Sequence, residues 1–274
     1  MQIERFTAEI DGQKIHYLRA GHGPPLLLLH GLLGGSFCWR QNLEALSREH
    51  TVLAVDLPGH GESAAPSHLD CSMAAQASRV SQLLEQLKLE KVDVVGCSWG
   101  GAIAMLLAAQ SGKVRSMVLA APVNPWSNLG KRRIRFVSRP LGEALLRITW
   151  PVSRHLYRIA LGRMYGDPSR IPAGTVEGYS SRVVRPGRVD NILNTLRSWE
   201  NDVNTLRAVI PRIKPRSLLI WGTDDGAVDV RSAEALRRAL PQSELVFMNG
   251  VGHLPFEETP DEFNRLVLDF IERP

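Results

Sequence analysis

The chain has 274 residues, of which 44% are hydrophobic and 22% charged, a composition typical of a soluble globular protein with one large domain. Its net charge is +5, but the sequence carries no nucleic-acid-binding motif, so we expect no nucleic-acid partner. No apolar run reaches the roughly 18 residues of a membrane span, and the start lacks the layout of a signal peptide. We therefore expect no integral membrane association and a cytoplasmic location. Three widely spaced cysteines form neither a disulfide framework nor a metal-ligand pattern.

Short apolar runs alternate with amphipathic stretches along most of the chain. Residues 2–10 and 13–21 alternate in polarity and are joined at Asp11-Gly12, which predicts an antiparallel hairpin. Later runs are rich in Leu, Val and Ile and are followed by turn residues, which predicts strands of a parallel sheet buried on both faces. These runs end at His30, Asp56, Gly96, Ala121, Gly222 and Gly250. The pattern indicates a doubly wound α/β sheet with an antiparallel hairpin at one edge.

The alternation stops between Val123 and Arg207. This stretch holds fifteen basic and six acidic residues, several prolines and helix-like pieces. We interpret residues 123–207 as an inserted helical subdomain, and residues 1–122 and 208–274 as the two parts of the α/β core. The basic excess is interpreted either as a solvated face or as a lid that attracts anionic substrates or an acidic surface.

A serine stands at the junction between an apolar run and a helical pattern. Ser98 follows the run that ends at Gly96, which places it on a sharp strand-to-helix turn with positive φ. Such a turn brings the neighbours two residues before and after too close for a Cβ, and both are glycine, Gly96 and Gly100. The glycines therefore let the hydroxyl stand above the sheet edge as a candidate nucleophile. Cys97 is a rival thiol, but its side chain should turn away from the site.

Five motifs in order resemble those of the α/β-hydrolase superfamily, in the branch with a helical cap after the sixth strand. They are HGLLGG at 30–35, DLPGHGES at 56–63, GCSWGG at 96–101, WGTDD at 221–225 and GHLPFEETP at 252–260. The resemblance covers essentially the whole chain. It implies a mostly parallel eight-stranded sheet with helices on both faces and the cap inserted after strand 6.

A serine hydroxyl needs a base, and the base needs an orienting acid. His253 follows the last predicted strand, at the carboxyl edge of the sheet where Ser98 emerges, and is the candidate base. The family pattern selects Asp225 over Asp224 as the acid. By the same resemblance, the backbone N–H groups of Leu32 and Trp99 form the oxyanion hole.

The expected reaction is hydrolysis of a small or medium carboxylic ester, a small-molecule substrate, through an acyl-enzyme on Ser98. No metal or organic cofactor is implied. A serine at the elbow, where epoxide hydrolases and haloalkane dehalogenases carry aspartate, argues against those activities. Alternatives with the same triad are a carbon–carbon hydrolase, in which Arg197 holds a substrate carboxylate, a cofactor-free perhydrolase, and a receptor with slow turnover. The candidates for substrate contact in the cap are Trp126, Trp150, Tyr179 and Trp199. The sequence does not define the oligomeric state.

Overall fold

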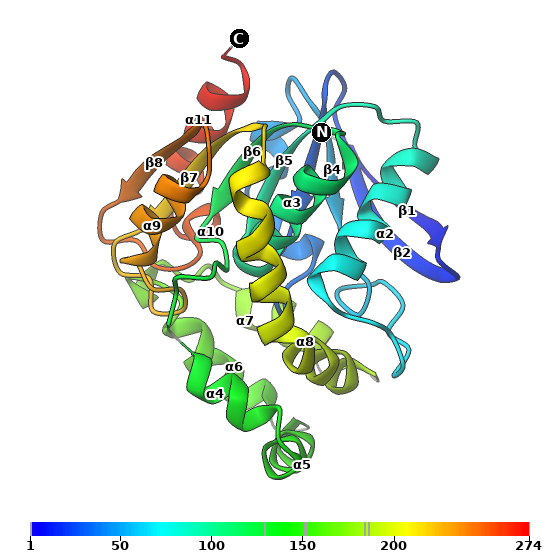
Figure 1. The fold of residues 1–274 in the computed structure, drawn as a ribbon, viewed down its shortest axis with the longest axis vertical. Helices are drawn as coiled ribbons and strands as arrows, with labels where there is room; N and C mark the ends of the chain where they lie inside the picture. The colour runs from blue at the N-terminus through cyan, green and yellow to red at the C-terminus, as the bar shows by residue number, and fades with distance from the viewer. Residues whose placement is uncertain (1, 129, 151–152, 184, 186, 274) are drawn as a thin grey trace.

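The computed structural model describes residues 2–128, 130–150, 153–183, 185 and 187–273. An eight-stranded sheet forms its centre, in the order β1-β2-β4-β3-β5-β6-β7-β8 (Figure 1). β1 and β2 pair antiparallel, β2 and β4 likewise, and all other neighbours are parallel. The strands are β1 (Ile3–Ile10), β2 (Gln13–Ala20), β3 (Pro25–Leu29), β4 (Thr51–Val55), β5 (Val92–Cys97), β6 (Val114–Ala120), β7 (Arg216–Gly222) and β8 (Ser243–Met248). The predicted sheet is confirmed.

The edge hairpin owes its turn to two residues in the left-handed region. Asp11 has φ 53° and Gly12 has φ 68°, which matches the backbone twist of a two-residue hairpin. The turn pairs Ile10 with Gln13 and fixes the register of the whole β1–β2 ladder. The Asp11-Gly12 prediction is therefore confirmed.

Alternation along the central strands builds an apolar core on each face of the sheet. In β3, Leu27 and Leu29 enter the cluster that α2 and α3 cover, whereas Leu26 and Leu28 enter the cluster that α11 covers. The α-helices are α1 (Leu43–Leu46), α2 (Met73–Gln86), α3 (Ser98–Ser111), α4 (Lys131–Val137), α5 (Pro140–Thr149), α6 (Ser153–Gly162), α7 (Thr175–Val183), α8 (Arg188–Val209), α9 (Ser232–Ala239), α10 (Pro255–Glu258) and α11 (Pro260–Ile271). Short 3₁₀ turns lie at η1 (Ser36–Trp39), η3 (Pro168–Arg170) and η4 (Ile210–Arg212).

Helices α4 to α8 lie between β6 and β7 in the chain, and we call them the inserted helices. In Figure 1, α4, α5 and α6 lie at the bottom, outside the sheet, and α8 returns from this layer alongside α3. Helices α4, α5 and α6 therefore form a separate layer over one end of the sheet. In the part of the chain that the structure describes, no helix combines the length and apolarity needed to cross a membrane.

Candidate active site

Ser98 occupies a strained turn between β5 and α3. It is the first residue of α3 and has φ 52°, a conformation that side chains other than glycine rarely adopt. A Cβ on Gly100 would lie 2.4 Å from the carbonyl oxygens of Leu29 and His30, and one on Gly96 would lie 2.7 Å from the carbonyl oxygen of Gly100. Both positions therefore admit only glycine at this backbone geometry, as the sequence pattern predicts.

His253 and Asp225 form a buried pair. The His253 Nδ1 lies 2.9 Å from the Asp225 Oδ2, and the two residues are only 3% and 8% exposed. The other carboxylate oxygen, Oδ1, accepts the N–H groups of Ala227 at 2.7 Å and Val228 at 2.9 Å. Asp224 is exposed, so the structure brings Asp225 and not Asp224 to the histidine. An Nδ1–H held by the carboxylate leaves Nε2 unprotonated and able to act as a base.

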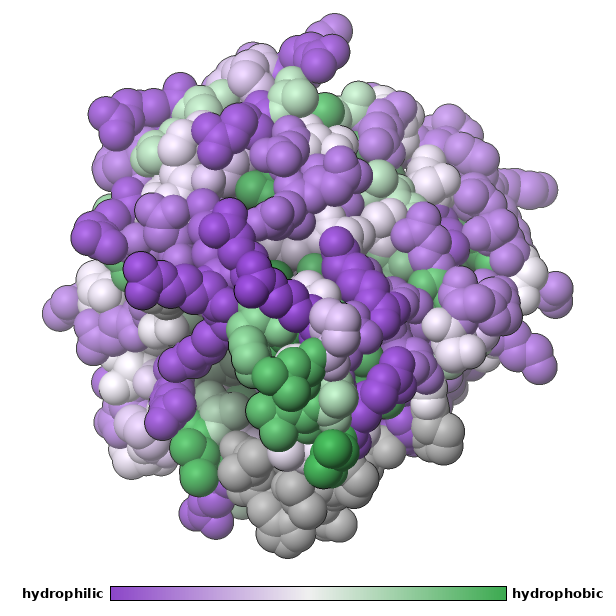
Figure 2. All heavy atoms as spheres, turned by 60° about the horizontal axis from the view of Figure 1, so that its bottom comes forward, coloured by the Kyte–Doolittle hydropathy of each residue, from purple (hydrophilic) through white to green (hydrophobic). Residues whose placement is uncertain are grey.

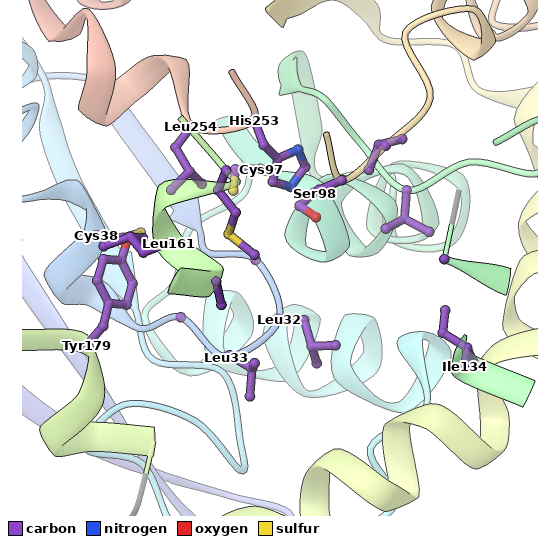
Figure 3. A pocket seen from close by; sticks show the side chains of 18 of the residues that line it. Leu32, Leu33, Cys38, Cys97, Ser98, Ile134, Leu161, Tyr179, His253 and Leu254 are labelled. Atoms are coloured by element: carbon purple, nitrogen blue, oxygen red, sulfur yellow. The ribbon is translucent and has the colours of Figure 1, made fainter. Parts of the chain in front are cut away.

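Ser98 and His253 line the same cavity, of about 380 Å³. Figure 3 shows the Ser98 hydroxyl and the His253 ring at the same end of it, with Leu254 beside the ring and Leu32 and Leu33 across the cavity. Lys131, at the start of α4, is the only Asp, Glu, Lys or Arg in the lining that the described residues provide. A hydroxyl and an imidazole therefore lie together at the wall of a largely apolar cavity.

The two expected oxyanion donors, Leu32 and Trp99, lie on the segments that meet at Ser98. Leu32 is the second residue of a turn that the Gly34 N–H closes onto the Gly31 carbonyl at 3.0 Å, with Leu33 at φ 64°. The Leu32 N–H takes no part in closing that turn. Trp99 is the second residue of α3, where an N–H group has no partner within the helix. A Cβ on Gly31 would lie 3.2 Å from the Ser98 Cβ, so the turn packs directly against the elbow.

The cysteine beside the nucleophile also borders the cavity. Cys97 is among the lining residues, so the expectation that its side chain turns away from the site is wrong. Burial raises the pKa of the Cys97 thiol, which keeps it in the neutral, weakly nucleophilic form. Cys97 therefore faces the site as a small apolar side chain.

Three of the four aromatic candidates border the cavity. Trp150, Tyr179 and Trp199 are lining residues, whereas Trp126 is not. The Trp126 ring instead lies 5.7 Å from the Arg207 guanidinium and packs against the core cluster beside α3. Arg197 is not in the lining either. Its guanidinium pairs with the Glu143 carboxylate, and the Arg197 Nε lies 2.7 Å from the Glu143 Oε1.

Two consecutive acidic residues after His253 anchor the inserted helices, and sequence reasoning missed both. The buried Glu257 carboxylate accepts hydrogen bonds from Arg40 Nη2 and Tyr165 Oη, each at 2.9 Å, and from Tyr179 Oη. Burial, followed by the charge of Glu257, raises the pKa of Tyr179, so this phenol stays protonated and donates.

Glu258 holds the neighbouring backbone in the same way. Its carboxylate accepts the N–H groups of Gly252 at 2.8 Å, Gly166 at 3.0 Å and Asp167 at 2.9 Å. The Gly252 N–H belongs to the loop that carries His253, and the other two belong to the inserted segment. The only signal in the sequence is a pair of acidic residues, Glu257 and Glu258, directly after the apolar Pro255-Phe256.

His30 and His60 are buried and are not among the residues that line the cavity. His30 Nε2 accepts the Leu57 N–H at 3.0 Å, so the protonated nitrogen is Nδ1, which donates to the Gly31 carbonyl at 2.8 Å. Burial lowers the pKa of His30 and lowers that of His60 to about 3. Both rings therefore stay neutral, and their hydrogen bonds hold the neighbouring turns at Gly31 and at Leu57–Pro58.

A sheet in this order, with a serine on the turn after β5 and an Asp–His pair after β7 and β8, defines the α/β-hydrolase class of proteins. The family model for the alpha/beta hydrolase fold matches residues 24–260, and the chain belongs to this family.

Named relatives in the family differ in what they are said to do. The magnesium-chelatase 30 kDa subunit of Rhodobacter capsulatus is 30% identical, over 91% of this chain and 87% of its own. Lipase 1 of Psychrobacter immobilis is 27% identical, over 96% of this chain and 84% of its own. Among solved structures, the epoxide hydrolase CorEH superimposes with a TM-score of 0.87 at 23% identity, over 98% of each chain. At that identity the likeness shows the fold alone.

Proposed function

We propose that the protein is a serine hydrolase that cleaves a small or medium carboxylic ester through an acyl-enzyme on Ser98. One observation carries the proposal. A buried carboxylate orients His253 in the apolar cavity that Ser98 enters from a strained turn. Membership of the α/β-hydrolase family and the similarity to Lipase 1 support the proposal.

The proposed reaction has two steps. His253 Nε2 takes the Ser98 proton as Oγ attacks the ester carbonyl, and Asp225 stabilises the imidazolium that results. The N–H groups of Leu32 and Trp99 hold the oxyanion of the tetrahedral intermediate. His253 then protonates the departing alcohol and activates a water molecule, which hydrolyses the acyl-enzyme and regenerates the serine.

The cavity favours an apolar acyl group of limited size. Its volume of about 380 Å³ lies at the lower end of the range for small-molecule sites, and its walls are largely aliphatic and aromatic. We assign Trp150, Tyr179 and Trp199 to substrate contact, and residues 123–207 to a lid over the cavity. The position of Trp126, beneath Arg207, gives it no such contact.

The geometry of the cavity bears differently on the three alternative functions. The carbon–carbon hydrolase interpretation loses its proposed carboxylate holder, because Arg197 is paired with Glu143 outside the cavity lining. A perhydrolase would use the same groups with peroxide as the acceptor. A slow-turnover receptor would keep the same groups without efficient turnover, and one relative at 30% identity is described as a chelatase subunit and not as a hydrolase.

Two assays on the same preparation test the proposal. A fluorophosphonate probe should label the wild type and not Ser98→Ala, and the wild type should hydrolyse p-nitrophenyl esters with an optimum in the acyl chain length. Ser111→Ala, a serine at the other end of α3, is the matched control and should label and turn over normally. Rapid labelling without turnover of any ester would favour the receptor, and wild-type turnover by Ser98→Ala would exclude the serine mechanism.

A further inference from the structure

An apolar stripe lies on the outer side of the inserted helices. On α5, Leu141, Leu145 and Ile148 recur at i, i+4 and i+7 and are 74%, 51% and 75% exposed. Phe136 on α4, which contacts α5, is 46% exposed. We call these four side chains the roof patch. Figure 2 shows hydrophobic side chains gathered on this end of the molecule and bordered by hydrophilic ones.

Such exposure is concentrated in one part of the protein. Eight large hydrophobic side chains are exposed in the described ranges, and the roof patch with Ile159 on α6 accounts for five of them. Leu141 and Ile148 are the most exposed of all. Scattered apolar residues on a surface need no explanation, but a contiguous stripe marks a surface that another phase or molecule covers.

Basic residues are frequent in the segment that carries the roof patch. Residues 131–163 hold nine Lys or Arg and a single acid, Glu143. Arg132 and Arg133 precede Phe136 by four and three residues on α4 and so share its side of the helix, and Arg139 directly precedes α5. These three arginines are exposed and form no ion pair with any residue that the structure describes. The surface is therefore both apolar and positively charged.

We propose that α4, α5 and α6 dock on an anionic lipid surface, with the roof patch in the acyl boundary and the arginines on the headgroups. An amphipathic helical surface with a basic border is the combination that binds such interfaces. A second copy of the chain fits less well, because a symmetric contact through the patch would bring the same arginines of both copies together. This is attachment at the surface and requires no helix that spans the bilayer.

In the docked orientation, the helices that line the catalytic cavity would face the lipid surface. Ile134 on α4 and Ala160 on α6 line the catalytic cavity, and Gly130 does so at the start of α4. Gly130 and Ala160 are also exposed, so the cavity lining reaches the protein surface at α4 and α6. We expect substrate to enter the cavity from the lipid phase, and this expectation rests on the proposed function. The docking itself does not depend on the proposed function.

Vesicle sedimentation tests the docking. Wild-type protein should sediment with vesicles of equal parts phosphatidylcholine and phosphatidylglycerol, and much less with phosphatidylcholine alone. About 1 M salt, where the Debye length is about 3 Å, should weaken binding to the anionic vesicles. Leu141→Ser/Ile148→Ser should lower the partition coefficient at least tenfold, which is less than the full loss expected when two aliphatic side chains are no longer buried.

Matched variants separate the docking surface from general effects. Arg132→Glu/Arg133→Glu should bind anionic vesicles at least tenfold more weakly than the wild type at low salt. The control is Arg237→Glu/Arg238→Glu, two consecutive exposed arginines on α9, which should bind more than tenfold more tightly than Arg132→Glu/Arg133→Glu. Phe247→Ser on β8, which is 44% exposed, should bind as the wild type does. All four variants should hydrolyse a soluble short-chain ester at the wild-type rate, because none of these residues lines the cavity.

Three results would overturn the docking. The wild type could fail to sediment with anionic vesicles, Phe247→Ser could lose as much binding as Leu141→Ser/Ile148→Ser, or light scattering could show a dimer that Leu141→Ser/Ile148→Ser dissociates. Each of them leaves the proposed function standing if the short-chain ester is still hydrolysed and Ser98 is still labelled. Loss of labelling and turnover would instead refute the proposed function without touching vesicle binding.

Discussion

The backbone N–H of His253 donates a 2.6 Å hydrogen bond to the carbonyl oxygen of Met164. Met164 lies in the segment between α6 and α7, so the inserted helices and the candidate base are joined directly through the main chain. The Glu257 and Glu258 carboxylates reinforce this junction from the other side of the loop. The position of the imidazole therefore depends on the insertion as well as on the sheet.

Gly252→Ala should disturb this junction. A Cβ at this position would lie 2.3 Å from the Met164 carbonyl oxygen and 2.4 Å from the Gly166 nitrogen, both backbone atoms. We expect kcat for ester hydrolysis to fall about 10²-fold as the base is displaced, and the free energy of unfolding to fall by about 1–3 kcal/mol. Gly162→Ala, where nothing lies within 4 Å, is the control and should change neither value downward. A wild-type kcat in Gly252→Ala would contradict the expectation.

Asp225→Asn should preserve the fold and remove most of the activity. An amide in place of the carboxylate no longer fixes the Nδ1–H tautomer and gives no charge to stabilise the imidazolium. In the serine-protease triad that serves as the template, this change costs about 10⁴ in kcat, and we expect an effect of similar order here. Asp224→Asn, the exposed neighbour, should retain wild-type kcat. Steady-state kinetics on a p-nitrophenyl ester measures kcat for both variants, and equal kcat values in Asp225→Asn and Asp224→Asn would contradict the expectation.

Glu257→Ala should destabilise the protein. The change leaves the Arg40 guanidinium and the Tyr165 and Tyr179 hydroxyls without their shared acceptor in a buried setting. Breaking a buried pair from one side typically costs about 3–5 kcal/mol, and we expect about 3 because Arg40 is partly exposed. Urea unfolding measures this loss. Glu262→Ala, at an exposed position on α11, should differ from the wild type by no more than about 0.5 kcal/mol.

Stability should fall on acidification below about pH 6.5, in part because of His60. Burial, followed by the charges of His30 and Arg188, lowers the pKa of His60 from 6.5 to about 3. Between these values the unfolded chain binds a proton that the folded protein does not, so the free energy of unfolding decreases as the pH falls, by up to about 1.4 kcal/mol per unit. The lowered pKa of His30 acts in the same direction.

The slope of this pH dependence is the quantity to compare between variants. Urea unfolding from pH 7 down to pH 5 should show a shallower slope in His60→Gln than in the wild type. His22→Gln, at an exposed histidine, should keep the wild-type slope. Equal slopes in all three proteins would show that His60 does not carry the effect.

Sequence reasoning succeeded where the deciding interactions are local. The Asp11-Gly12 turn and the glycines around Ser98 are each dictated by the backbone within a few residues, and both have the expected geometry. The parallel character of the sheet follows from buried apolar runs, and its eight strands follow from the family resemblance. These features needed no knowledge of how the insertion packs.

The remaining features depend on contacts between distant parts of the chain. Arg40, Tyr179 and Glu257 meet through three separate segments, and no local pattern marks such a meeting. The cavity takes Trp150 and Trp199 but not Trp126 because the fold of the insertion, and not aromatic character, decides which rings face inward. The catalytic roles, the 123–207 boundaries and the cytoplasmic location stay predictions.

The Met164 junction also limits how this scaffold can be re-engineered. A chimera that exchanges the insertion for that of a relative would keep a main-chain carbonyl and N–H groups there, but their positions would no longer be matched to the His253 loop and to Glu258. A successful graft must therefore transfer residues 164–167 together with the loop at 252–258, as a matched unit. Recombination that exchanges single loops should therefore give far fewer folded, active variants than exchange of the paired segments.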